Sequence, residues 1–375
     1  MKVTALLPLM LLTCPAADAA VTLTRSGNHS IGLEGLIQGD ANSYDSDRRD
    51  LGDDRLGRLR RAEFILKGAG GGPLDWVLGW DAKSEKFLDV NLRGRWKAAG
   101  LDHSLQAGQF KQPNSLEELS STKGNDFIAK AAITNTFAVS RRLGAGYGLS
   151  DDRWSLAASM FGDELTGGGA EGDGWAARAT WAPLQHSGKT LHLGLSHAHQ
   201  EVAGLRIRAR PNADLTDVRL VDTGMLDNAH RHKTTGLEAL WLAGPLKLQA
   251  EHTSARTKRH QGHDVETRGL YASALYNLGG SSWKYDKGLP SPPSVESNSH
   301  LWQLGARIDR LDLDDGDVRG GRMQALTLGL NWLVGEHLKV ALNQVWVDSE
   351  RLERDAARTA SDDPAITELR VQLHW

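Results

Sequence analysis

Short segments in which apolar and polar residues alternate recur along almost the whole sequence. A segment of this kind folds as a β-strand with one apolar and one polar face. The polar positions hold Ser, Thr, Asn, His, Arg, Asp and Gly, which suit a water-filled lumen better than a packed core. The pattern therefore predicts an all-β protein. Examples of the apolar faces are Trp76, Leu78 and Trp80; Trp154, Leu156, Ala158 and Met160; Leu191, Leu193 and Leu195; and Leu326, Leu328, Leu330 and Trp332.

Composition separates the β-architectures that remain possible from other classes of protein. The 375 residues include 12 Trp, and 44 basic residues nearly balance 47 acidic ones, which does not fit a long disordered chain. No internal stretch approaches the ~20 apolar residues of a spanning helix, so a helical membrane protein is excluded. A transmembrane β-barrel remains, because only every second residue of its strands is apolar. The net charge of -3 argues against a nucleic-acid partner.

The first residues have the plan of a secretory signal peptide, which we place at residues 1–19. Lys2 supplies the basic start, and Ala17-Asp18-Ala19 is a small-x-small cleavage site. Cleavage there leaves residues 20–375 as a single barrel domain. The one cysteine, Cys14, is then lost, so neither a disulfide nor a thiol enzyme is expected. Acylation of Cys14 as a lipoprotein is the alternative, which the bulky residue before it disfavours.

The last residues alternate as well, with Leu369, Val371, Leu373 and Trp375 on one face of a predicted strand. A final strand that ends in an aromatic residue resembles the C-terminal signature of bacterial outer-membrane proteins. Together with the signal peptide, it predicts an integral β-barrel in the Gram-negative outer membrane. The alternative is the last amphipathic strand of a soluble β domain.

Long polar segments and tight turns separate the predicted strands. At about 22 residues per strand and connection, the mature chain gives about sixteen strands, and the number must be even in a bacterial single-chain barrel. Tight turns such as Ala243-Gly244-Pro245 fit the periplasmic rim. We expect a closed antiparallel barrel whose long polar segments are extracellular loops. These segments are 40–58, 163–174, 203–233, 257–266, 279–299, 312–322 and 348–364.

Several motifs occur in order along nearly the whole mature chain. They are LRRAEF at 59–64, GQFKQP at 108–113, SLEELSS at 115–121, GLE at 236–238 and LGLNW at 328–332. Together they resemble the phosphate- and polyphosphate-selective porins, the O/P porin family. The resemblance implies a sixteen-stranded homotrimeric porin, with a loop folded into the lumen, that passes small anions such as phosphate. Outer-membrane lipid and lipopolysaccharide would surround it.

Arg60 and Arg61 are the first candidate site residues. Strict alternation puts them on opposite faces of their strand, with Arg61 on the face of Glu63 and Lys67, so at least one of the two faces the lumen. The resemblance implies that this pair helps to line an anion-binding constriction. The simpler interpretation is that lumen arginines only solvate the wall and brace loops.

A second polar face carries Asp89, Asn91, Arg93, Arg95 and Lys97. A ring of Lys and Arg replaces part of the lost hydration of a permeating anion. Guanidinium groups suit phosphate because they bind it through two parallel hydrogen bonds. We therefore place Arg93 and Arg95 in the anion pathway. The resemblance implies that Asp89 is a carboxylate that weakens binding so that the anion can leave.

Residues 111–130 resemble the third loop of the family, which folds into the barrel and narrows it. The resemblance implies that Ser120 and Ser121 bind the anion and that Lys130 lies near a cationic wall position.

Three positions depart from the phosphate-specific members of the family. Glu118 and Val77 stand where those members have lysine, and Leu36 stands where they have arginine. Losing three cations and gaining an acid weakens the expected affinity for a divalent oxyanion. The choice between phosphate, polyphosphate and other anions therefore stays open.

Arg206, Arg208 and Arg210 alternate with apolar residues further along the chain. This series resembles the arginine ladder of the family, a stack of cations that focuses the field and leads anions toward the constriction. The alternative is a basic surface strip that touches lipopolysaccharide.

Motifs of catalysis and metal binding are missing from the sequence. It has no Gly-x-Ser-x-Gly elbow, no glycine-rich phosphate loop before a helix and no His-Glu-x-x-His helix. The loop residues His230, His232, His260 and His263 lack the spacing of a metal site. We therefore expect no catalytic residue, metal or cofactor, and predict a passive, anion-preferring channel for phosphate or polyphosphate rather than an enzyme. The alternatives are a porin for other small solutes or organic anions, and a plugged barrel enzyme or adhesin.

Overall fold

The computed structural model describes residues 20–27, 29–46, 51, 55–167, 171–186, 188–353 and 358–375. The expected signal peptide, residues 1–19, lies outside the described residues. The strands of the wall are β2 (His29–Asp45), β3 (Arg55–Gly70), β4 (Leu74–Asp81), β5 (Lys86–Ala98), β6 (Leu101–Lys111), β7 (Arg141–Ser150), β8 (Trp154–Phe161), β9 (Gly174–His186), β10 (Lys189–Glu201), β13 (Ala229–Ala243), β14 (Leu246–Arg259), β15 (Val265–Leu278), β18 (His300–Asp315), β19 (Val318–Val334), β20 (Leu338–Glu353) and β22 (Ala365–His374).

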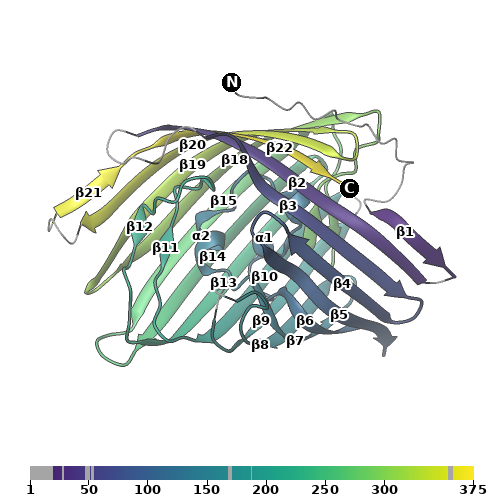
Figure 1. Cartoon of the computed structure of the whole chain (residues 1–375), viewed down its shortest axis with the longest axis horizontal. Coiled ribbons are helices and arrows are strands. Elements are labelled where there is room, and N and C mark those ends of the chain that lie inside the picture. The colour runs from purple at the N-terminus through teal and green to yellow at the C-terminus, as the bar shows by residue number, and fades with distance from the viewer. Residues whose placement is uncertain are drawn as a thin grey trace, which may run out of the picture.

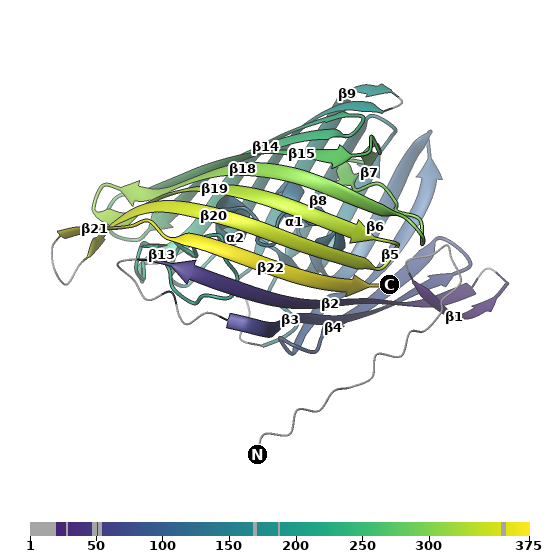
Figure 2. The same ribbon diagram turned by 90° about the horizontal axis from the view of Figure 1, so that it is seen from above.

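These strands form one antiparallel sheet that closes on itself (Figures 1 and 2). Each wall strand pairs with its neighbours along the chain, and the last strand, β22, pairs with the first, β2, from Leu36↔His374 to Asp45↔Ala365. The described sheet contains 18 strands, two of which are the short β1 (Val21–Ser26) and β21 (Arg358–Asp362) beside β2 and β20. The other sixteen close the barrel, as the spacing of the alternating segments predicted.

The alternating pattern places apolar side chains outside and polar side chains inside. Leu304 and Leu328 face outward with 48% and 44% of their surfaces exposed, whereas their inward neighbours Gln303 and Thr327 are 2% and 0% exposed. A water-soluble protein shows the reverse distribution. The outer wall is therefore built to contact lipid, and the polar interior is covered by segments that fold into the lumen.

Connections at one rim are mostly short, and those at the other rim are mostly long. The β5–β6 turn shows why two residues can be enough: Ala99 and Gly100 have φ values of 51° and 79°, which suit the backbone twist of a tight hairpin. Short turns mark the periplasmic side of bacterial barrels, so we call this the periplasmic rim and the opposite one the extracellular rim. No helix among the described residues is both long and apolar enough to cross a membrane.

Two expected extracellular loops differ in the structure. Residues 279–299 connect β15 to β18 at the periplasmic rim, where they form a hairpin of β16 (Lys284–Asp286) and β17 (Leu289–Ser291). Residues 312–322 lie almost entirely in the β18–β19 hairpin, whose turn is only Gly316 and Asp317. The polar composition of residues 279–299 does not indicate at which rim this segment lies. Residues 312–322 are acidic because they extend β18 and β19 beyond the apolar band of the wall.

Candidate functional site

The connection between β6 and β7, residues 112–140, folds into the lumen and is named here the constriction loop. It contains α1 (Leu116–Leu119), the 3-10 turn Thr122–Gly124 and α2 (Ala132–Phe137), which lie within the ring of strands (Figure 1). Apolar loop side chains are buried against apolar residues of the inner wall, which explains the fold of the loop. Leu116 and Phe127 pack with Leu240 and Leu275, and Ile133 and Phe137 pack with Leu311 and Leu313.

Charged residues of the inner wall fix the backbone of the constriction loop. The Glu251 carboxylate accepts hydrogen bonds from the backbone N–H groups of Leu116 and Glu117, each at 2.8 Å. The guanidinium groups of Arg307 and Arg370 donate to loop carbonyls at 3.0 Å and 2.8 Å. These wall charges therefore position the loop and are not free to meet a permeating ion.

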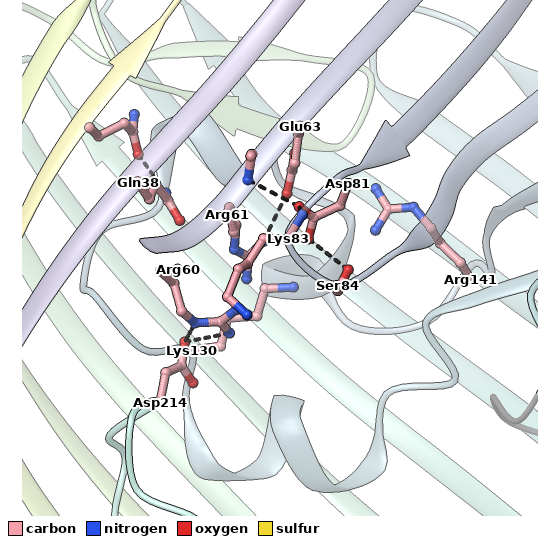
Figure 3. A network of polar contacts seen from close by, with 12 residues as sticks. Gln38, Arg60, Arg61, Glu63, Asp81, Lys83, Ser84, Lys130, Arg141 and Asp214 are labelled. Carbon is pink, nitrogen blue, oxygen red and sulfur yellow. Dashed lines mark hydrogen bonds and ion pairs between the residues drawn. The ribbon is translucent and has the colours of Figure 1, made fainter. Parts of the chain in front are cut away.

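Both arginines of the predicted pair face the lumen, because a β-bulge interrupts the alternation of β3. Gln38 on β2 pairs with Arg61, but the next residue, Gly39, pairs with Leu59, so Arg60 is the extra residue. An extra residue of this kind redirects its side chain. Figure 3 shows Arg60 and Arg61 entering the lumen from β3, with Asp214 at the end of Arg60.

Four cations of the constriction each form an ion pair with a carboxylate. Figure 3 shows Arg141 on the side opposite to Arg60. The four pairs lie around the constriction loop. They are Arg60 with Asp214 at 2.9 Å, Arg61 with Glu63 at 3.3 Å, Arg141 with Asp89 at 2.9 Å, and Lys130 with Glu118. Pairing of this kind lowers the net positive field along the pathway without removing the guanidinium donors.

Glu118 is the centre of the pairs made by the constriction loop. Its carboxylate contacts the Lys130 ammonium and accepts a hydrogen bond from the Ser140 hydroxyl at 3.0 Å. Burial by itself would raise the pKa of Glu118, but the ammonium groups of Lys130 and Lys111 lower it to about 2. Glu118 is therefore ionised at neutral pH and neutralises a cation that would otherwise face the pathway.

Asp214 plays the same part for Arg60 from another loop. It belongs to residues 202–228, which connect β10 to β13. Burial would raise the pKa of Asp214, but Arg60, Arg370 and Arg61 lower it to about 2. Two loops therefore each bring a permanently charged carboxylate to the cations of the wall.

The three arginines of the predicted ladder lie on the loop 202–228, which folds inside the barrel. Ile207 and Ala209 are buried in one cluster with Ile133 of the constriction loop and Leu313 of the wall, so the arginines that alternate with them point to the other side. This placement does not fit a strip on the outer surface.

The ladder arginines differ in their partners. Arg206 pairs with Asp222 at 2.9 Å, and Arg210 pairs with Asp217 at 3.1 Å. Arg208 on β11 (Arg208–Ala209) is exposed and forms no ion pair within the described ranges. β11 pairs with β12 (Val221–Asp222), which keeps the backbone of the ladder arginines extended.

The remaining predicted residues are spread over a longer part of the lumen. Arg93 and Arg95 both contact Asp75, close to the periplasmic end of β4 and β5, away from Asp89. The Ser120 hydroxyl donates to the carbonyl of Leu116 at 2.8 Å, which closes α1. The structure therefore does not gather Arg93, Arg95 and the serines around the arginine pair.

The periplasmic segment 279–299 also enters the lumen. The Trp283 ring lies 4.4 Å from the Lys247 ammonium, and the Tyr285 hydroxyl lies 2.8 Å from Nδ1 of His192. Arg178 donates to the carbonyl of Gly288 at 3.0 Å. Ser121 lines a small cavity between this segment and the constriction loop. The lumen is therefore narrowed from both rims.

Several residues of the site were missed in the sequence. Arg141 and Asp214 complete two of the ion pairs, and Lys83 near the extracellular rim is an exposed cation without a side-chain ion pair among the residues described. Arg141 and Arg142 are adjacent arginines at the start of a strand, and this feature resembles the pair Arg60 and Arg61. Asp214 lies in a polar loop, and no feature of the sequence indicated its role.

Leu36 and Val77, which stand where phosphate-specific members of the family are expected to have cations, are uncharged residues on the inner wall. Leu36 is fully buried opposite Glu63, and Val77 lies on the inward face of β4 opposite Asn91. Within the described ranges, no three His, Cys, Asp or Glu side chains are grouped so that they could hold a metal ion.

Comparisons with known proteins agree with the β-barrel fold. The sequence profile of the family described as phosphate-selective porin O and P matches residues 31–375. An uncharacterized protein of Caulobacter vibrioides is 30% identical over 355 residues, which cover 86% of this chain and 69% of that protein. Porin O of Pseudomonas aeruginosa is 24% identical over 210 residues, which cover 47% of this chain and 48% of Porin O.

Solved structures with the same fold are also porins. OmpT of Vibrio cholerae superimposes with a TM-score of 0.59 at 8% identity and covers 94% of this chain and 99% of its own. The anion-selective porin from Comamonas acidovorans has a TM-score of 0.56 at 13% identity, covering 92% of this chain and 100% of its own. The chain therefore belongs to the phosphate-selective porin O and P family and is an integral β-barrel porin of the Gram-negative outer membrane.

Proposed function

We propose that this porin is a passive channel that prefers anions. The observation that carries the proposal is the bulge in β3, which brings both Arg60 and Arg61 into the lumen beside the constriction loop. Arg61 uses one nitrogen to contact Glu63 at 3.3 Å, so most of its N–H donors remain for a passing anion. The N–H groups of arginine replace part of the water that an anion loses in a narrow pore.

Cations without an acidic partner add to this preference. Lys83 at the extracellular end of the lumen and Arg208 on the inner loop are exposed, and neither forms an ion pair in the part of the chain that the structure describes. Exposed cations of this kind along the lumen raise the local anion concentration.

Phosphate and polyphosphate are the proposed substrates, bound weakly. The family of the chain and its similarity to Porin O support this choice. The four ion pairs of the constriction, however, neutralise much of the charge that would hold a divalent oxyanion. We infer a channel that conducts phosphate among other small anions without retaining it.

A homotrimer is the proposed assembly. β4 and β8 have 8 residues each, whereas β19 has 17, so the barrel wall is shorter on the side of β4–β8. Eight residues at about 3.3 Å span ~26 Å along a tilted strand, which is short for the hydrocarbon core unless another subunit covers it. OmpT of Vibrio cholerae includes a trimer form among the structures of this fold. A particle mass of three chains in mild detergent supports the trimer, and a single-chain mass contradicts it.

Arg61→Ala tests the proposed role of the arginine pair in planar bilayers. We expect the ratio of chloride to potassium permeability to fall about tenfold, because a unit charge at ~6 Å in water shifts the energies of the two ions by ~0.7 kcal/mol each, in opposite directions. Arg153→Ala, in the periplasmic turn between β7 and β8, removes the same charge away from the lumen loops and serves as the matched control. An unchanged ratio in Arg61→Ala would remove this residue from the pathway.

Phosphate added to the chloride solution tests the substrate in the same bilayers. We expect partial block of the chloride current only at millimolar phosphate, since the ion pairs of the constriction weaken the site. Block at micromolar phosphate would contradict the weak site, and the absence of any block at tens of millimolar would remove phosphate as a substrate.

A further inference from the structure

The periplasmic segment 279–299 crosses the lumen from one side of the ring of strands to the other. It connects β15 to β18, and the Lys287 ammonium at its tip lies 2.8 Å from the Asp102 carboxylate on β6. Eight successive pairings lead from β6 to β18, which is half of the ring, so these two strands face each other across the barrel. The segment therefore divides the periplasmic mouth of the barrel into two parts.

One part of the mouth, along β9–β14, is filled by the segment itself. The Tyr285 hydroxyl lies 2.8 Å from Nδ1 of His192 on β10, and the Trp283 ring lies over the Lys247 ammonium on β14. The Arg178 guanidinium on β9 donates to a backbone carbonyl at the tip of the segment, at 3.0 Å. These contacts fix the segment against this side of the inner wall.

The constriction loop fills the mouth along β20, β22 and β2. Lys339 of β20 donates to the carbonyl of Asn125, and Gln372 of β22 donates to the carbonyl of Lys123 at 3.0 Å. The Lys123 ammonium in turn contacts the Glu34 carboxylate of β2 at 3.1 Å. The loop is therefore tied to this side of the inner wall from three strands.

The inner wall of β4–β6 lies between these two filled parts and stays accessible to water. Arg93 on β5 and Asp75 on β4 are 38% and 24% exposed, whereas Arg307 and Asp309 on β18 are each 1% exposed. Ser104 on β6, which pairs with Arg95 of β5, is half-buried as well. Inside a barrel, exposed side chains mark the space that water and ions occupy.

We propose that permeating ions leave the lumen through an exit along the inner wall of β4–β6. Asp75 and Arg93 edge this exit on the wall, and Lys287 and Asp102 edge it at the tip of the crossing segment. A solute that has passed the constriction therefore meets side chains of both charges a second time, and the width of the exit adds a second limit on its size. The proposal rests on the passive channel proposed above, but not on its preference for anions.

A cysteine placed in the exit and modified after folding tests its position. In Ser104→Cys we expect the anionic reagent sulfonatoethyl methanethiosulfonate to react with the thiol, because an accessible thiolate is nucleophilic. The attached group then occupies part of the exit, so the single-channel conductance in KCl should fall about twofold or more. Val77→Cys, on the inward face of β4, takes its place if Ser104→Cys does not fold.

Ser273→Cys is the matched control, because Ser273 faces inward on β15 and is only 8% exposed. Its conductance should not change on treatment, and neither should that of the treated wild type. Heat-modifiable migration on gels shows that each variant is a folded barrel, and mass spectrometry shows whether the thiol has reacted.

Three results would each overturn the proposed exit. They are the absence of reaction at the exit cysteine, reaction there without loss of conductance, and an equal loss of conductance in Ser273→Cys. The attached group obstructs chloride and potassium alike, so the outcome does not depend on which ion the channel prefers. The sign of the zero-current potential tests the anion preference separately.

Discussion

Glu118 occupies the position at which the resemblance to the family implies a lysine, and the structure shows the physical consequence at the scale of one residue. Its carboxylate holds Lys130 in a buried ion pair instead of leaving two cations facing the pathway. One substitution thereby changes the local charge by two units relative to a lysine.

Removing this acid should increase anion preference. Glu118→Gln keeps the size and polarity of the side chain and frees the Lys130 ammonium. We expect the chloride-to-potassium permeability ratio to rise about tenfold, because a unit charge at ~6 Å in water shifts the energies of the two ions by ~0.7 kcal/mol each, in opposite directions. Reversal potentials of single variants in bilayers give this ratio. Glu336→Gln, at the periplasmic rim, is the control with the same loss of charge. A ratio equal to that of wild type would show that Glu118 does not act on the permeating ion.

The pH dependence of this effect has a defined direction. The pKa of Glu118 is lowered from 4.5 to about 2, so its ion pair is present at neutral pH and is lost only as the pH falls through about 2. The difference in permeability ratio between wild type and Glu118→Gln should therefore stay constant from pH 8 to pH 4. A difference that disappears by pH 4.5 would mean that the carboxylate titrates normally.

Single residues also show where sequence reasoning reached its limit. Alternation predicted that at least one of Arg60 and Arg61 faces the lumen. Both do, because β3 has an extra residue there, and such a bulge has no signature in the alternating pattern. The partners Asp214 and Arg141 come from distant parts of the chain. Asp214 lies in a polar loop, which has no periodicity from which its contact could be derived. Arg141 begins a strand and resembles the pair at 60 and 61, but alternation does not identify Asp89 as its partner.

At the scale of the elements, the strands were predictable because lipid on one side and water on the other impose a strict period of two. The rim to which a connection belongs was less predictable. Residues 279–299 have the composition of an extracellular loop but lie at the periplasmic rim, where Trp283 and Tyr285 pack into the lumen. The aromatic rings of Trp283 and Tyr285 within this polar segment were the sequence feature that could have indicated packing in the lumen.

The constriction loop depends on a few wall contacts, and the carboxylate of Glu251 is one that can be removed. Glu251→Ala leaves the N–H groups of Leu116 and Glu117 without acceptors, at a cost of about 1–3 kcal/mol each. We expect the loop to loosen, with a higher single-channel conductance and more current noise. Tyr271→Phe removes the third partner of the same carboxylate and keeps both backbone bonds. Equal conductance in Glu251→Ala and wild type would contradict this anchoring role.

At the scale of the whole molecule, the barrel separates its charges by location. The net charge of -3 is small, yet arginines and lysines line the inner wall and loops, and nearly every one near the constriction has a carboxylate partner. An anion therefore meets hydrogen-bond donors along the lumen, but little unpaired positive charge that would bind it tightly. This arrangement suits conduction, which requires binding weak enough to release the ion.

The zero-current potential of the wild-type porin in a KCl gradient measures directly whether the channel prefers anions. Because Arg60 and Arg61 both face the lumen and Lys83 and Arg208 lack ion-pair partners in the described chain, we expect chloride to be more permeable than potassium. The potential should then take the sign of the chloride equilibrium. A potential of the opposite sign, showing a preference for potassium, would contradict the account.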